Sequence, residues 1–181
     1  MTLISTISDL LDDPQGVIGR TSRRELGWAG MSGYGLGIFS LFIFLRLFSA
    51  VPPGAYSYAS LLLLGLGVNF CFAAGIHLFL EMTGAEGDAL KLFFLFGLTE
   101  LFMMLLIPLG FLARLDYLNP VADFFLCFAV IIAARVSIIR RLYSISRNKA
   151  LLSAAMPYAA VFSGFFMLLV YAIVYLVWLV V

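Results

Sequence analysis

Charged residues are scarce in this chain. They make up 12% of its 181 residues, against about 25% in ordinary soluble domains, whereas hydrophobic residues reach 64%. The formal net charge is only +1, and no Lys/Arg-rich run is interleaved with aromatic residues, which excludes nucleic acid as a partner. The apolar residues are spread over most of the length, with a mean hydropathy of +1.10. This composition predicts an integral membrane protein.

Side chains that commonly act in catalysis or bind metal ions are also scarce. The chain has one histidine, His77, and two cysteines, Cys71 and Cys127, which lie inside apolar stretches and are expected to be small buried hydrophobic residues. His77, Glu81 and Glu86 lack a defined metal-ligand spacing, which favours a solvated helix end over a metal site. No Ser/His/Asp or Cys/His arrangement can be assembled. We therefore expect no catalytic residues, no bound metal and no cofactor.

Five segments are long and apolar enough to cross about 30 Å of hydrocarbon as helices. The sequence predicts an all-α fold, an integral membrane bundle of five transmembrane helices over residues 27–181. The expected spans are 27–49, 56–80, 89–112, 121–142 and 151–181. A cytoplasmic segment, residues 1–26, precedes them. Residues 1–13 place apolar side chains at helical spacing, which predicts a short amphipathic helix in the membrane interface; the alternative is a frayed terminus with chance periodicity.

The positive charges gather on one side of the predicted spans, where they indicate the cytoplasm. This side holds Arg20, Arg23, Arg24, Lys91, Arg140, Arg141, Arg147 and Lys149. Only Arg46 and Arg114 lie near span ends on the other side. We therefore expect the N-terminus in the cytoplasm and, with five spans, the C-terminus outside.

Three stretches of the chain, taken together, resemble the Yip family of Ypt/Rab-interacting membrane proteins. They are LLDDPQGVIG (10–19), HLFLEMTGAEGDALKLFFLFGL (77–98) and SISRNKALLSAAMPYA (144–159). The resemblance implies a five-span bundle, and short prokaryotic members of the family have no assigned function. Only about two dozen residues precede the first span, without the family's motifs for Rab GTPase binding, so GTPase binding is not carried over. A prokaryotic plasma (inner) membrane is the expected location.

Glu100 is the most informative single residue. It lies about eleven residues into the third span and so close to mid-membrane, where an ionised carboxylate needs a partner. Arg135 in the fourth span could be this partner, and Asn69 or His77 in the second span could hydrogen-bond to Glu100. The alternative is that Glu100 is protonated. One interpretation is a polar site for an ion, a proton or a lipid headgroup. The other is a structural link between helices, which is at least as well supported.

Two further sets of residues are predicted to be structural. Ala29, Gly33 and Gly37 repeat at four-residue spacing in the first span, which lets another helix approach closely. Internal packing is favoured over contact with a second copy. Arg46 and Asp123 lie at similar depth near the outer ends of the first and fourth spans, so they are predicted to form an ion pair.

The basic link between the fourth and fifth spans is a candidate for binding anionic lipid headgroups. It holds Arg140, Arg141, Arg147 and Lys149. The alternative is that these residues only set the topology, which requires them whether or not a lipid is recognised.

The function predicted from the sequence is that of a non-enzymatic membrane scaffold or accessory subunit, which acts by association with other membrane components. Its expected partners are membrane lipids and another membrane protein or a second copy of the chain. The alternative is a small transporter or lipid-handling protein that uses Glu100 and Arg135. A continuous polar cavity that reaches Glu100 would favour the alternative, whereas a bundle filled by side chains would favour the scaffold.

Overall fold

The computed structural model describes residues 23–180, and within this range it contains helices and no strand. The elements are α3 (Arg23–Leu47), α4 (Ala55–Met82), α5 (Ala89–Glu100), the 3₁₀ helix η1 (Leu101–Leu105), α6 (Leu106–Arg114), α7 (Pro120–Leu142) and α8 (Arg147–Val180). Because α5, η1 and α6 are consecutive, five helices of this range are long and apolar enough to cross a membrane. This agrees with the predicted all-α class and with an integral membrane protein. The amphipathic helix predicted over residues 1–13 lies outside the described residues.

The helix bounds are close to the predicted spans, and the largest differences are at two N-terminal ends. The helix α3 begins at Arg23 instead of residue 27, and α8 begins at Arg147 instead of residue 151. Hydropathy locates the apolar part of a helix, whereas charged first turns project into the membrane interface and are missed by it.

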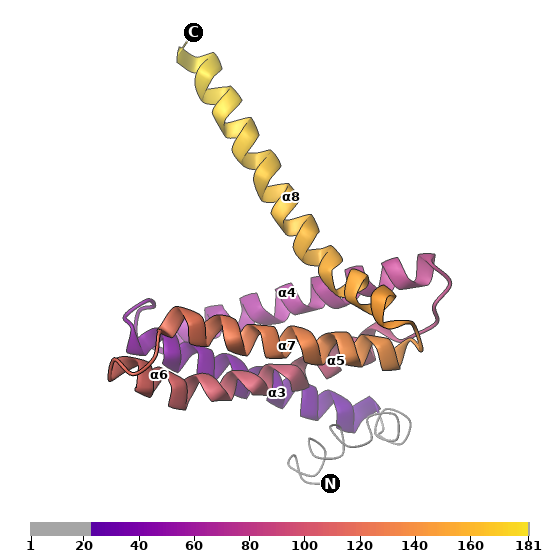
Figure 1. Cartoon of the computed structure of the whole chain (residues 1–181), viewed down its shortest axis with the longest axis horizontal. Helices are drawn as coiled ribbons and strands as arrows, with labels where there is room; N and C mark the ends of the chain where they lie inside the picture. The colour runs from indigo at the N-terminus through magenta and orange to yellow at the C-terminus, as the bar shows by residue number, and fades with distance from the viewer. Residues whose placement is uncertain (1–22, 181) are drawn as a thin grey trace.

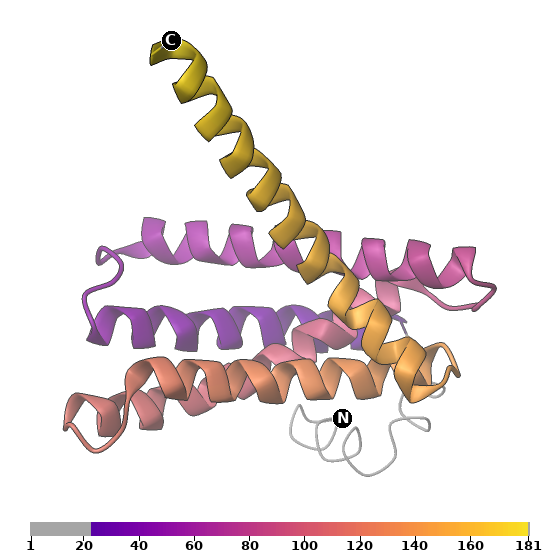
Figure 2. The same cartoon turned by 45° about the horizontal axis from the view of Figure 1, so that its top comes forward.

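Four membrane-length units lie side by side as an up-and-down bundle, and α8 leaves it (Figures 1 and 2). The units are α3, α4, α5 with η1 and α6, and α7. One end of the bundle, which we call the basic end, carries the start of α3, the start of α5, the end of α7 and the start of α8. It holds Arg23, Arg24, Lys91, Arg140, Arg141, Arg147 and Lys149. The cations that were predicted to lie on one side of the membrane thus lie at one end of the bundle. Arg20 is outside the described residues.

The closest pair of helices is α3 and α5, which run parallel because α4 follows α3 in the chain and runs back in the opposite direction. A methyl group at Gly33 would overlap with the Gly97 carbonyl, and one at Gly37 would overlap with the Glu100 carbonyl. Gly30 makes the same kind of contact with the backbone of Phe94. The predicted small-residue face of the first span therefore packs inside the chain. Gly30, and not Ala29, is its third member; Ala29 is only half-buried beside the core.

The third span is interrupted one turn before a proline. Pro108 has no N–H to donate to the Met104 carbonyl, and its ring would clash with that carbonyl in a regular α-helix. The chain passes through the 3₁₀ helix η1, Leu101–Leu105, immediately before α6. This interruption follows Glu100 directly, so Glu100 is the last residue of α5.

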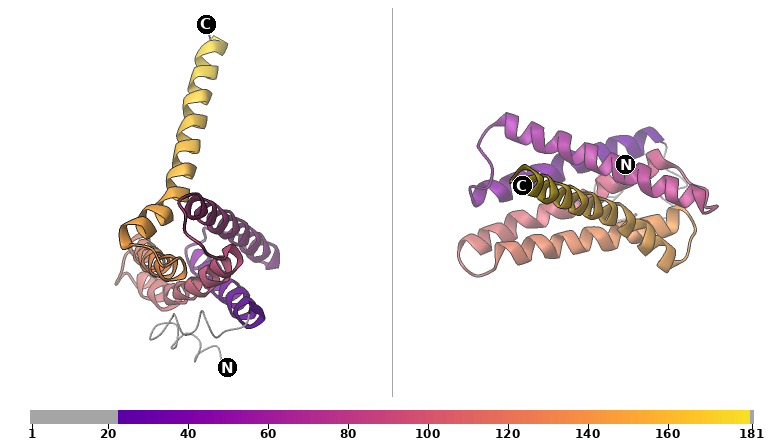
Figure 3. Two further views of the ribbon diagram at one scale, coloured as in Figure 1. Left: turned by 90° about the vertical axis from the view of Figure 1, so that its right-hand side faces the viewer. Right: turned by 90° about the horizontal axis from the view of Figure 1, so that it is seen from above.

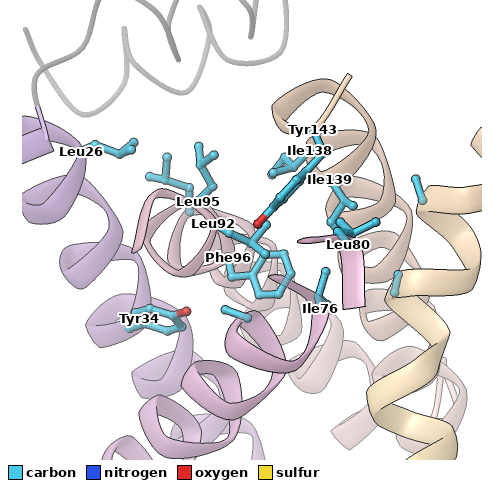
Figure 4. Packing of buried hydrophobic residues seen from close by; sticks show 14 of the residues in the cluster. Leu26, Tyr34, Ile76, Leu80, Leu92, Leu95, Phe96, Ile138, Ile139 and Tyr143 are labelled. Carbon is cyan, nitrogen blue, oxygen red and sulfur yellow. The ribbon is translucent and has the colours of Figure 1, made fainter. Parts of the chain in front are cut away.

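The apolar core has two parts along the bundle. The larger one lies towards the basic end, where residues from α3, α4, α5 and α7 converge around Phe96 and Tyr143 (Figure 4). The smaller one lies towards the opposite end and includes Phe44, Leu106 and Cys127. Cys127 is buried as predicted, but Cys71 is exposed on α4, which corrects its predicted burial. In lipid an exposed face is as apolar as a core, so composition alone does not separate the two.

Candidate functional site

The centre of the bundle contains a buried ion pair between α5 and α7. Arg135 on α7 and Glu100 at the end of α5 are 6% and 7% exposed, and Arg135 Nη2 lies 2.6 Å from Glu100 Oε1. Each charge is costly in an apolar surrounding, and the pair compensates both. Two of the predicted residues are thus brought together by α5 and α7.

Asn69 on α4 joins this pair and bridges it to a third helix. Its Oδ1 accepts a hydrogen bond from Arg135 Nη2 at 2.5 Å, and its Nδ2 donates to Glu100 Oε1 at 3.2 Å. The same Nδ2 also donates to the carbonyl of Gly65, 2.9 Å away, which fixes the amide on its own helix. The amide therefore contacts both members of the pair; its hydrogen bond to Glu100 was predicted, whereas the one from Arg135 was not.

Three more side chains surround the Arg135 guanidinium. Its Nε donates to Thr99 Oγ1 at 3.2 Å and its Nη1 to Tyr158 Oη at 3.5 Å, while its Cζ lies 4.6 Å from the ring centre of Phe96. We call the whole group the Arg135 cluster; it consists of Asn69, Phe96, Thr99, Glu100, Arg135 and Tyr158. Thr99, Phe96 and Tyr158 were not predicted from the sequence, although Thr99 is adjacent to Glu100. Three bundle helices and the first turns of α8 meet at this cluster.

Little space remains beside the cluster. The cavity next to Arg135 has a volume of about 10 Å³, and Phe72, Ile76 and Ile132 are among the apolar residues that line it. A single water needs about 10–15 Å³ of such volume. The cavity is therefore at the lower limit for one water and is far too small for an organic substrate.

No family model, curated protein or solved structure matches this chain. The chemistry of the Arg135 cluster follows from its own geometry. Its guanidinium is fixed by acceptors from three helices and by an aromatic ring, and its carboxylate accepts from Arg135 and Asn69. Such a group links helices and orients them, because loss of either charged residue would leave the other one without its counter-ion in an apolar surrounding.

His77 does not join the Arg135 cluster, which corrects the fourth residue of the predicted polar site. Its Nδ1 lies 2.8 Å from Tyr143 Oη, and its Nε2 lies 3.6 Å from Glu81 Oε2. His77 is eight residues beyond Asn69 on the same helix, or about 12 Å along the axis towards the basic end. Within residues 23–180, no group of three His, Cys, Asp or Glu side chains is placed to hold a metal ion.

The predicted ion pair between Arg46 and Asp123 is not formed. Arg46 Nη1 donates to the Val51 carbonyl at 2.8 Å, in the turn that follows its own helix. Asp123 is 6% exposed in the first turn of α7, and its Oδ2 has no hydrogen-bond partner. Equal depth in the membrane does not fix the direction in which each helix points its side chain, so depth alone could not establish this pair.

The cations of the basic end differ in their contacts. Arg23 Nη2 forms an ion pair with Asp88 Oδ2 at 2.8 Å, and Lys149 Nζ donates to the Thr83 carbonyl at 3.1 Å. In contrast, Arg140, Arg141 and Arg147 are exposed and take part in none of the ion pairs between residues 23 and 180.

Asp88 immediately precedes α5 and ties it to α3. Its Oδ1 accepts from the backbone N–H groups of Leu90 and Lys91, at 3.0 and 3.1 Å, so it caps the helix. Partial burial disfavours its ionised form, but these hydrogen bonds and the charge of Arg23 outweigh that effect. Together they hold the pKa of Asp88 below its ordinary value.

Proposed function

We propose that this protein is a non-enzymatic scaffold or accessory subunit of a membrane assembly, and that it associates with its partner through α8. The observation that carries the proposal is the position of this helix. It contacts α4 and α7 only near its start and then diverges from the bundle (Figure 3). Every residue from 159 to 179 is exposed. More than half of the longest helix in the described part of the chain is therefore available to another membrane component.

The exposed part of α8 also carries a small-residue face. Ala160 and Gly164 are four residues apart, and no atom of the chain lies within 4 Å of a methyl group built at Gly164. In lipid, helices associate through close packing of small residues and not through a hydrophobic driving force. The corresponding face of α3, Gly33 and Gly37, is already covered by α5. The α8 face supports an association with a second copy or with another membrane protein.

The alternative, a small transporter or lipid-handling protein that uses Glu100 and Arg135, has less support. Transport needs a path by which a substrate or ion reaches the charged pair. The cavity beside Arg135 holds about 10 Å³, and the guanidinium group of the pair already donates to Asn69, Thr99 and Tyr158. This geometry supports a structural link between the helices.

The proposal includes a place in the membrane. The basic end would face the cytoplasm of a prokaryotic cell, with the amphipathic residues 1–13 in the interface of the plasma (inner) membrane and the C-terminus outside. It keeps the resemblance to the Yip family as the proposed origin of the five-span arrangement. A cysteine placed at Tyr117, in a variant without Cys71 and Cys127, should react with a membrane-impermeant maleimide in intact cells. Reaction at Ser144 instead would reverse the orientation.

Site-specific photo-crosslinking in the native membrane tests the function. A photoreactive residue at Phe165 of α8, which is 65% exposed, should yield a crosslinked protein adduct of defined mass. The matched control is Phe125 of α7, which is 62% exposed on the bundle itself. Adducts at Phe165 and not at Phe125 would support association through α8. Lipid adducts alone at Phe165, or the same protein adducts at both positions, would refute it.

A further inference from the structure

A groove lies between α7 and α8 and shares only Ile132 with the cavity beside Arg135. Its volume is about 550 Å³. It is lined by Ala129, Ile132, Ala133, Val136, Ser137 and Arg140 of α7 and by Arg147 and Leu151 of α8. The α7 residues recur every three or four positions, so they form one continuous face of that helix.

The groove is apolar along most of its length and cationic at one end. Arg140 ends the α7 face and Arg147 begins α8, so the two guanidinium groups border the groove where the helices are joined. Neither forms any of the ion pairs between residues 23 and 180, and no Asp or Glu lines the groove. The positive charge of this end is therefore available to an anion.

The length of the groove matches one leaflet of a membrane. Arg140 lies eleven positions after Ala129, which corresponds to about 16 Å of helix and to about half of a 30 Å hydrocarbon core. Ser137, one turn from Arg140, adds a hydroxyl at a depth below the guanidinium groups where the ester linkages of a phospholipid lie. An acyl chain fits the apolar face, and a phosphate fits the arginine pair.

We propose that this groove binds one anionic phospholipid of the leaflet at the basic end, with its headgroup phosphate between Arg140 and Arg147 and an acyl chain along Ala133 and Val136. Positive charge near a membrane surface attracts anionic lipids. The apolar groove distinguishes this site from a general cationic surface, because Arg141 has the same charge at nearly the same depth and does not line it. The site is independent of association through the exposed part of α8.

Native mass spectrometry of the full-length protein tests the proposal. The protein would be reconstituted with equal amounts of phosphatidylglycerol and phosphatidylcholine, transferred to detergent, and analysed for retained lipid. The wild type should retain one phosphatidylglycerol in preference to phosphatidylcholine. In the double variant Arg140→Gln/Arg147→Gln, the ratio of retained phosphatidylglycerol to retained phosphatidylcholine should fall by about tenfold or more. The matched control Arg141→Gln should keep the ratio of the wild type.

A second variant tests the groove separately from the charge. Ala133→Phe adds bulk at an exposed lining position and keeps every arginine, so it should abolish retention of the lipid with unchanged helical content. Equal loss in Arg141→Gln and in the double variant would overturn the proposal, because it would reduce the site to surface charge. Displacement of the lipid by inorganic phosphate alone, or retention in Ala133→Phe, would overturn the acyl-chain part.

Discussion

Replacing Glu100 by leucine should be among the most damaging single changes in the bundle. The substitution removes the carboxylate but leaves Arg135 charged, because a guanidinium group is not deprotonated in proteins. Loss of one partner from a buried ion pair typically costs about 3–5 kcal/mol. A typical domain has about 5–15 kcal/mol in total, so Glu100→Leu should remove a large part of the free energy of unfolding.

The sign of the coupling is a sharper test than the size of one effect. Arg135→Leu should cost less than Glu100→Leu, about 1–3 kcal/mol, because the remaining carboxyl group can take up a proton and become neutral. Asn69 and Thr99 would keep the hydrogen bonds that they donate to the carbonyls of Gly65 and Phe96. The double variant Glu100→Leu/Arg135→Leu should therefore be more stable than Glu100→Leu alone.

The measurement is equilibrium unfolding in mixed micelles, with dodecyl sulfate as the denaturant and helicity followed by circular dichroism. Glu81→Leu is the matched control, because it removes a carboxylate that is 66% exposed and lies 3.6 Å from His77. It should cost less than about 1 kcal/mol. The ion pair would not stabilise the bundle if Glu100→Leu lowered the free energy of unfolding no more than Glu81→Leu does. The same would follow if the loss in the double variant equalled the sum of the losses in the two single variants.

Two other changes test contacts elsewhere. Gly33→Ala should destabilise the protein by about 1–3 kcal/mol in the same unfolding assay, because the methyl group would push α3 away from the Gly97 carbonyl. The matched control Gly67→Ala should be neutral or stabilising, because no atom lies within 4 Å of a methyl group built there. Because the pKa of Asp88 is lowered, its charge stabilises the fold above the ordinary value of 3.8, and this contribution is lost as the pH falls through the lower folded pKa. Asp88→Asn keeps the cap but not the charge, so thermal melts from pH 6 to 3 should show a smaller loss of stability than in the wild type; equal slopes would contradict the role of Arg23.

The span-level architecture was predictable because lipid imposes it. Backbone groups must be satisfied within each apolar segment, so long apolar runs become helices and their number follows from counting. The grouping of cations at one end also follows from the sequence, since consecutive spans alternate in direction. The position of α8 outside the bundle was not predictable, because in lipid a packed helix and an isolated one are equally apolar.

For the site, the sequence predicted only the depth of each polar residue in the membrane. Glu100, Arg135 and Asn69 lie near mid-span in three helices, and depth together with charge was enough to group them. Arg46 and Asp123 satisfied the same rule and yet do not pair: Arg46 donates to the Val51 carbonyl, and Asp123 Oδ2 has no hydrogen-bond partner. The rotation of each helix about its axis depends on packing that a single sequence does not reveal.

The short 3₁₀ helix η1 changes the direction in which side chains point within the third span. Gly97 and Gly110 are thirteen residues apart, and in an uninterrupted α-helix their directions would differ by about 220°, on nearly opposite sides. The five residues of η1 advance about 120° each instead of about 100°, which brings the two directions to within about 40°. Both glycines accordingly face α3, Gly97 at Gly30 and Gly110 at Phe44. The change of pitch keeps the third span in phase with its neighbour on both sides of the interruption.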